Sequence, residues 1–240
     1  DMVVTVSHAG YIKRVPLSTY RTQRRGGKGR AGMSTREEDF VAQVSVVNTH
    51  TPLLFFSSRG KVYKLKTYRL PLGTPQARGR PMVHLLPLAE GETIATILPL
   101  PEDESTWADL VAVFATAEGL VRPISLSKFD NILSTGIIAI KLKEGDRLVG
   151  VTLAADDDDI LLVARGGKCI RFAMQGVRLM GGRSTAGVRG MALKSSDEVI
   201  SMSVLHHLEA EADERQAYLQ AVAARRRLGA SDYEGKDADK

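Results

Sequence analysis

Apolar residues recur along the chain in short consecutive runs, each followed by a turn and a glycine. Four segments share this pattern around Gly10, Gly60, Gly119 and Gly167, which lie 50, 59 and 48 residues apart. In each segment a β-rich run precedes the glycine, and apolar residues follow it two and five positions later. Glycine supplies the positive φ that a tight hairpin turn needs. The pattern therefore predicts four β-hairpins.

A second shared element lies at the far end of each unit. It is clearest over Gly136–Val151, its counterparts begin at Gly79 and Gly187, and the version in Arg36–Val44 is less regular. We expect each unit to hold about four strands, and a repeat near 50 residues with that content is typical of propeller blades. Consecutive apolar residues, as in 53–56, indicate strands covered on both faces. A β-sandwich of hairpins is the alternative.

The expected fold class is all-β, a propeller-like array of four-stranded blades with a C-terminal helix and a polar tail. The blades are expected near residues 1–50, 51–108, 109–157 and 158–205. After them, Leu208–Leu228 begins with acids and ends with three arginines. That order suits the helix dipole, so we expect a helix that ends at Gly229. Residues 206–240 are thus predicted to be a helical insertion, with a disordered tail over Ser231–Lys240.

Composition and charge narrow the setting and the partner. The apolar runs are far too short for a membrane span, no apolar leader precedes the first predicted strand, and Cys169 is the single cysteine. These features predict a cytoplasmic protein without a disulfide or a membrane partner. Residues 1–88 hold 15 Lys and Arg against 4 Asp and Glu. Such crowding favours a polyanionic partner, although a solvated basic surface is the alternative.

A glycine-rich basic segment follows the first predicted hairpin. Its residues are Gln23, Arg24, Arg25, Gly26, Gly27, Lys28, Gly29 and Arg30. Glycines weaken strands and helices, but they let backbone N–H groups and cationic side chains converge on phosphate oxygens. Residues 27–32 also match the dinucleotide pattern G-x-G-x-x-G, yet a basic stretch precedes them and a strand, not a helix, is expected to follow. A Walker loop is excluded because Gly29 follows Lys28.

Residues 23–29 match every position of the box Q-(R/K)-R-G-G-(R/K)-G. The chain thereby resembles the C-terminal domain of the A subunit of bacterial DNA gyrase, over roughly residues 2–205. That resemblance implies a β-pinwheel whose basic rim binds, bends and wraps duplex DNA without sequence preference and without catalysis of its own. The family usually has six blades, whereas four are counted here. The related topoisomerase IV domain, in which the box is degenerate, is an alternative.

The resemblance also implies a larger assembly around this domain. Its parent would be an ATP-dependent type IIA topoisomerase that introduces negative supercoils near the nucleoid. The partners would be the gyrase B subunit, together with the N-terminal catalytic region of the A subunit, in a holoenzyme of two A and two B subunits. ATP and Mg would bind elsewhere in that holoenzyme, so no cofactor is expected in this domain.

Further candidate DNA contacts are the basic residues predicted on the blade rim. They are Lys13, Arg14, Arg21, Lys61, Lys64, Lys66, Arg69, Arg78, Arg80, Arg122, Arg171 and Arg178. Cations that contact phosphates without reading bases give salt-dependent binding to any sequence. A protein-interaction scaffold with an incidental basic patch is the second hypothesis, and a dinucleotide-binding enzyme is the third.

No catalytic or metal-binding set is predicted from the remaining polar residues. The histidines at positions 50, 84, 206 and 207 lack the spacing of metal ligands. Cys169 is expected to be an inert core residue, and Asp156–Asp159 a solvated loop between blades. None of the six tyrosines stands out as a nucleophile for DNA cleavage.

Overall fold

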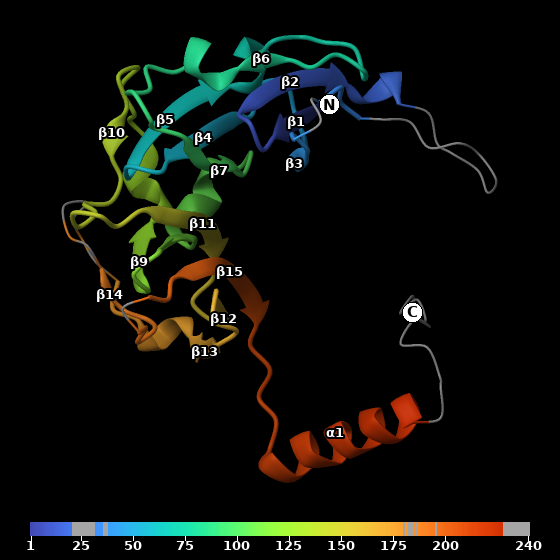
Figure 1. The fold of residues 1–240 in the computed structure, drawn as a ribbon, viewed down its shortest axis with the longest axis vertical. Helices are drawn as coiled ribbons and strands as arrows, with labels where there is room; N and C mark the ends of the chain where they lie inside the picture. Colours follow the sequence, from blue (N-terminus) through green and yellow to red (C-terminus); the bar gives the residue numbers. More distant parts are fainter. Residues whose placement is uncertain are drawn as a thin grey trace. The chain divides into compact units, whose positions relative to one another are not determined.

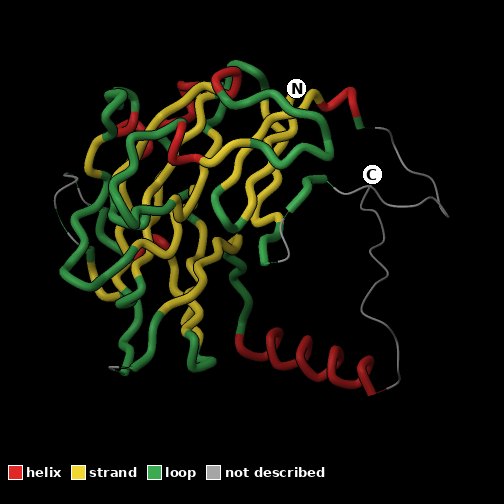
Figure 2. The backbone as a smooth tube through the Cα atoms, turned by 45° about the horizontal axis from the view of Figure 1, so that its top comes forward, coloured by secondary structure: helices red, strands yellow, loops and turns green. Residues whose placement is uncertain are grey.

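The computed structural model describes residues 1–20, 32–35, 38–179, 181, 185, 187–194 and 196–227. The chain divides into two compact units, Asp1–Leu205 and His206–Lys240. The first consists almost wholly of strands and loops, and the second holds one helix, α1 (Ala212–Arg227), as Figure 2 shows. Among the residues described, no helix has the length and apolarity needed to cross a membrane.

Four small sheets follow one another along the first unit, here named sheets A to D (Figure 1). Sheet A has the order β3-β1-β2-β6, with β1 (Met2–Ser7), β2 (Tyr11–Pro16), β3 (Val41–Val47) and β6 (Arg80–Pro81). Sheet B has the order β10-β5-β4-β7, with β4 (Pro52–Ser57), β5 (Lys61–Lys66), β7 (Ile94–Pro99) and β10 (Ile137–Ile138).

The other two sheets repeat the same antiparallel hairpin. Sheet C has the order β11-β8-β9-β14, with β8 (Val111–Thr116), β9 (Leu120–Ser125), β11 (Leu148–Ala154) and β14 (Val188–Arg189). Sheet D has three strands, β13-β12-β15, with β12 (Asp158–Ala164), β13 (Cys169–Ala173) and β15 (Val199–His206). The predicted fold class, a propeller-like array with one C-terminal helix, is therefore confirmed.

In each four-stranded sheet, the outer strand beside the second hairpin strand comes from the next unit of the sequence. β6, β10 and β14 each pair antiparallel with the second strand of the preceding hairpin. Each directly follows a glycine with positive φ, namely Gly79, Gly136 and Gly187. The second element of the repeat is thus divided between two sheets. In Gly136–Val151, the glycine end completes sheet B, and the far end enters β11 of sheet C.

Consecutive sheets pack face to face through three apolar clusters. Sheets A and B share a cluster that includes Ile12 and Phe55, and sheets C and D share one that includes Val113 and Leu162. Between B and C, the ring of Phe56 meets that of Phe114 edge-on at 5.3 Å. A fully buried side chain of this size contributes about 1.5–3 kcal/mol. This stacking explains why the runs are apolar on consecutive residues.

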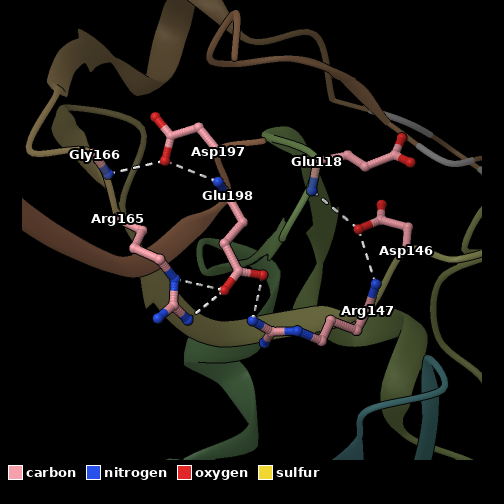
Figure 3. A network of polar contacts seen from close by, with 7 residues as sticks. All are labelled: Glu118, Asp146, Arg147, Arg165, Gly166, Asp197 and Glu198. Atoms are coloured by element: carbon pink, nitrogen blue, oxygen red, sulfur yellow. Dashed lines mark hydrogen bonds and ion pairs between the residues drawn. The ribbon is translucent and has the colours of Figure 1, made fainter. Parts of the chain in front are cut away.

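In three sheets, an aspartate hydrogen-bonds the hairpin turn. The aspartate lies just before the closing strand, which is the strand that pairs with the first strand of the hairpin. Asp146 Oδ1 accepts hydrogen bonds from the amides of Glu118 (3.0 Å) and Arg147 (2.8 Å), and Asp197 Oδ1 repeats this with Gly166 and Glu198, both at 2.9 Å (Figure 3). In sheet A, the Oδ1 of residue 39 bonds the amides of residues 9 and 40. These bonds fix the turns relative to the closing strands.

Short 3-10 helices follow the hairpins or lie in connections. They are η1 (Leu17–Thr19), η2 (Thr67–Arg69), η3 (Met82–His84), η4 (Glu104–Ala108), η5 (Leu126–Phe129) and η6 (Met174–Gly176).

The C-terminal helix begins four residues later than predicted. The carboxylate of Glu214 accepts a hydrogen bond from the amide of Glu211, and the carbonyl of Glu211 accepts one from Arg215. This is the geometry of an N-cap at Glu211, so residues 208–211 stay outside the helix. The expected charge order, acids first and arginines last, is confirmed. The predicted end at Gly229 and the predicted disordered tail lie outside the described residues.

Candidate nucleic-acid interface

The glycine-rich box, Gln23–Gly29, lies outside the described residues, as do Arg21 and Arg30. Its expected role as a DNA contact therefore stays a prediction. The candidate interface is built here from the other predicted cations, which the structure divides into buried, partnered and exposed groups.

Two of the predicted rim residues, Lys13 and Arg122, are buried in the protein, so their placement on the rim was wrong. Lys13 Nζ donates hydrogen bonds to the carbonyl oxygens of Thr74 (3.0 Å) and Pro75 (2.5 Å), and burial lowers the pKa of this ammonium group. Arg122 Nη1 donates to the carbonyl of Thr185. Both residues stand three positions after a hairpin glycine, where the connection to the next unit's short strand crosses the sheet. The hydrogen bonds from these two cationic side chains fix that connection to the sheet.

Three further cations are partly covered and serve the same connections. Arg14 Nε donates to the carbonyl of Leu70 at 2.9 Å. Lys64 Nζ donates to the carbonyl of Asp130 at 2.9 Å and lies 5.8 Å from the centroid of the Trp107 ring. The guanidinium of Arg78 lies over the ring of Tyr11, with its carbon 4.1 Å from the ring centroid. Because ammonium and guanidinium groups donate several hydrogen bonds, these side chains keep some capacity for a ligand.

Arg171 is exposed, but its charge is compensated within the sheet. Its Nε lies 2.6 Å from Oδ2 of Asp159, and the side chain of that aspartate is only 4% exposed. The expectation of a solvated loop over Asp156–Asp159 was therefore wrong for half of the segment. Asp156 and Asp157 are exposed at the turn, whereas Asp158 and Asp159 are buried in β12. Periodicity did not show that Arg171 on the neighbouring strand would pair with Asp159, or that Asp158 would accept a hydrogen bond from the amide of Ala155.

Five predicted contacts are exposed and form no ion pair with another described residue. They are Lys61, Lys66, Arg69, Arg80 and Arg178. All lie on the second strand of a hairpin, on the connection after it, or on the short strand that covers it. The arrangement presents cations along one series of equivalent edges, where they can meet phosphate oxygens.

The structure adds two exposed cations that the sequence analysis did not single out. Lys128 lies in η5, nine residues after Gly119, which is the position that Arg69 holds relative to Gly60. Arg189 lies on β14, the strand equivalent to the one that carries Arg80. Aligning the units on the hairpin glycine would have identified Lys128 from the sequence.

Cys169 is exposed on β13, which corrects its expected place in the core. The residue was predicted to be buried because it lies in an apolar strand. Within the described part of the chain, no group of three or more His, Cys, Asp or Glu is placed to hold a metal ion.

Comparison with known proteins now decides the family. The family described as "DNA gyrase C-terminal domain, beta-propeller" matches residues 1–48, 51–101, 112–155 and 158–206. This chain belongs to that family. The A subunit of DNA gyrase from Rickettsia bellii is 52% identical over 228 residues, which cover 95% of this chain and 25% of the relative. The chain thus spans about a quarter of the length of the curated relatives it matches.

Two solved structures place this gyrase-type domain among its structural relatives. A crystal structure of the C-terminal domain of DNA topoisomerase IV matches with a TM-score of 0.72 and 25% identity, covering 86% of this chain and 61% of that one. A DNA gyrase A C-terminal domain matches with a TM-score of 0.63 and 27% identity, covering 85% and 64%. The fold is therefore similar to both, while the curated relatives that match at 50–52% identity are gyrase A subunits.

Proposed function

We propose that this domain binds duplex DNA through the exposed cations of its hairpin edges and bends the duplex as it does so. The observation that carries the proposal is the placement of Lys61, Lys66, Arg69 and Arg80, exposed and outside the described ion pairs, in a chain of the gyrase C-terminal family. Exposed lysine and arginine heads neutralise the negative charge of a phosphate backbone. The buried cations Lys13 and Arg122 take no part in the contact.

Binding of this kind is independent of base sequence and sensitive to salt. Phosphate contacts release counterions, so the logarithm of the binding constant falls with the logarithm of salt concentration by about 0.9 per contact. Smoothly bending 20–30 base pairs by 40–90° costs on the order of 1–6 kcal/mol, so several contacts must act together to offset it. A series of equivalent edges on successive sheets supplies contacts of this kind.

The glycine-rich box, residues 23–29, acts in this proposal as a clamp on one end of the bent DNA. Elastic recoil concentrates force at the ends of a bent segment, so a clamp there extends the wrap more than it strengthens binding. The wrap, by its hand, would let a gyrase holoenzyme introduce negative supercoils. Strand passage, ATP and Mg would belong to the B subunit, together with the rest of the A subunit.

The edge contacts are tested by neutralising single lysines. Lys66→Met removes an exposed cation, and we expect the salt slope of DNA binding to fall by about 0.9 on any duplex sequence. Lys143→Met is the matched control, because Lys143 is also exposed but lies 3.7 Å from the carboxylate of Glu118. Binding isotherms at four salt concentrations give both slopes. An unchanged slope for Lys66→Met would remove this residue from the interface.

The clamp is tested with the triple change Arg24→Ala, Arg25→Ala and Lys28→Ala. Because many other cations remain, we expect DNA affinity within about tenfold of the parent, or roughly 1.4 kcal/mol. The bend, measured by energy transfer between dyes at the two ends of a duplex, should be mostly lost. Supercoiling by a reconstituted enzyme should fail while relaxation persists. A variant that bends DNA as the parent does would show that the box is not the clamp.

A further inference from the structure

An aromatic side chain lies among the exposed cations of sheet B. Tyr68 is the middle residue of η2 (Thr67–Arg69), and it is 41% exposed. Lys66 directly precedes η2 and Arg69 ends it, and both are exposed residues of the proposed DNA contact. The chain thus places a tyrosine between two proposed phosphate contacts.

The geometry of η2 turns Tyr68 and Arg69 toward solvent together. A 3-10 helix has three residues per turn, so its successive side chains point about 120° apart. Thr67 is 0% exposed and faces the protein, which leaves the two remaining directions to Tyr68 and Arg69. Both residues therefore lie on the side of η2 that is turned away from the core.

The backbone that carries Tyr68 is held by the connection between β3 and β4. The amide of Tyr68 donates to the carbonyl of Thr49 at 2.9 Å, and the amide of Thr67 donates to that of Thr51 at 3.0 Å. The hydroxyl of Thr67 donates to the same carbonyl of Thr51 at 2.9 Å. These three bonds fix the position of the exposed tyrosine.

The ring of Tyr68 also has an aromatic neighbour that orients it. The imidazole ring of His50 meets it edge-on, with the ring centroids 5.8 Å apart and the ring planes at 63°. His50 is itself exposed, and its amide is bonded to Oδ1 of Asn48 at 2.9 Å. Because both rings are exposed, packing within the described protein leaves much of the Tyr68 surface accessible to a ligand.

The fold of the hairpin units does not require an aromatic residue at this position. Tyr68 stands eight residues after Gly60, and the same count from the other hairpin glycines gives Ser18, Ser127 and Gln175. Each of these residues lies in a 3-10 helix, as Tyr68 does. The helix therefore forms with a small polar residue in sheets A and C, and the tyrosine of sheet B is available for another role.

We infer that Tyr68 is a non-ionic contact with the sugar-phosphate backbone of bound DNA. Its hydroxyl donates a hydrogen bond to a phosphate oxygen, and its ring packs against the adjoining deoxyribose. Tyrosine suits this place because its ring is apolar while its hydroxyl is polar. The inference rests on the proposed function, since Lys66 and Arg69 bring the backbone to the ring.

An uncharged contact has a recognisable effect on the salt dependence of binding. Each contact between a cation and a phosphate adds about 0.9 to the salt slope, because counterions are released, whereas a tyrosine releases none. Loss of Tyr68 should therefore weaken binding by the same factor at every salt concentration. Loss of Lys66 should instead weaken binding most at low salt.

The inference is tested on the full 240-residue chain with Tyr68→Ser, which gives η2 the residue found at positions 18 and 127. We expect DNA affinity to fall about tenfold at each of four salt concentrations, with the salt slope unchanged. Tyr68→Phe removes only the hydroxyl, and we expect a loss of about fivefold, the usual net value of one hydrogen bond. Fluorescence anisotropy of a labelled duplex gives the isotherms.

Tyr218→Ser is the matched control, because Tyr218 is 70% exposed on α1, in the other compact unit. It should leave both the affinity and the slope unchanged. Lys66→Met tests the proposed function separately, since its slope should fall by about 0.9 whether or not Tyr68 is a contact. If Lys66→Met lowers the slope while both Tyr68 variants bind like the parent, only the present inference fails.

Two results would overturn the inference. Unchanged affinity of both Tyr68 variants at every salt concentration would show that the ring does not touch DNA. A lowered salt slope for Tyr68→Ser would show that the ring only positions Lys66 and Arg69. Circular dichroism and urea unfolding check that each variant is folded. If Tyr68→Ser is unstable, Tyr68→Phe decides alone, because it keeps the ring and its contact with His50.

Discussion

Sheets C and D are built on the same hairpin, yet their second strands lie in different surroundings. On β9 the residues Leu120, Val121 and Arg122 are all buried, because β14 and its approach cover them. In sheet D the equivalent residues, 168–170, are exposed. The hairpin pattern is therefore local, whereas the burial of its outer edge depends on a segment more than 60 residues away.

The comparison also shows why charge in a sequence does not by itself identify a ligand site. Arg122 and Arg171 both lie on second strands and both were predicted to contact DNA. Arg122 is buried and bonds the carbonyl of Thr185, while Arg171 is exposed and pairs with the buried Asp159. An arginine on this strand can hold the next connection, neutralise a buried acid or face solvent. Which of these roles an arginine takes depends on whether a connection of the next unit packs across its strand.

The largest effect is expected from the hairpin glycines. Gly119→Ala places a Cβ 2.6 Å from the carbonyl oxygen of Met191 at φ +80°, so the segment after β14 that contains Met191 must move. We expect the free energy of unfolding to fall by about 3–4 kcal/mol. Gly167→Ala has a similar φ of +81° and an open space, so only the backbone cost of about 1 kcal/mol should remain.

Urea unfolding of both variants measures this difference directly. Equal losses of unfolding free energy would mean that the segment containing Met191 adjusts at no cost. The outer edges of β9 and β13 would then differ less than their burial indicates. A larger loss for Gly167→Ala would show that a segment also covers sheet D in solution.

The repeat itself could be predicted from the sequence, because strand alternation and a glycine at the turn are local properties. Gly79, Gly136 and Gly187 were also recognised as the start of a shared element. Their pairing with the preceding sheet was not predicted, since nothing local shows that a two-residue strand joins another unit. This non-local pairing is also why Lys13 and Arg122 were placed on the surface and Cys169 in the core.

The candidate interface could be predicted only in part, for the same reason. Lys66 and Arg69 lie at the end of a strand and in the connection after it, where no crossing segment covers them, so local reasoning places them correctly in solvent. Lys13 stands in mid-strand and meets residues 74 and 75, which are distant in sequence. Alignment of the repeats therefore helps at strand ends and connections, and misleads in mid-strand, where a segment distant in sequence decides burial.

An intermediate effect is expected from the two arginines of the comparison. Arg122→Ala removes a fully buried side chain together with its bond to the carbonyl of Thr185, and we expect a loss of about 2–3 kcal/mol. Arg171→Ala removes an exposed partner from the nearly buried carboxylate of Asp159, and we expect about 1 kcal/mol. Thermal unfolding at pH 7 compares the two. A greater loss for Arg171→Ala would mean that the buried carboxylate outweighs the loss of packing at Arg122.

The smallest effect is expected at the ion pairs of Glu198, which join sheets C and D. Glu198 accepts hydrogen bonds from Arg165 Nε (2.9 Å) and Arg147 Nη2 (2.8 Å), and these bonds lower the pKa of its carboxyl group in the folded protein (Figure 3). A lowered folded-state pKa means that the stabilisation is complete above the unfolded value of about 4.3 and is lost as pH falls through the folded value. Glu198→Gln should therefore lower the Tm slightly at pH 7.

That difference in Tm between parent and variant should shrink as the pH falls below about 4 and as salt is added, because all three side chains are partly exposed. Glu144→Gln is the matched control, since Glu144 is exposed and forms no ion pair with another described residue. It should leave Tm unchanged at every pH. If the Glu198→Gln difference persists at low pH, the two arginines hold this side chain through its shape and not its charge, and the contact between the sheets is not electrostatic.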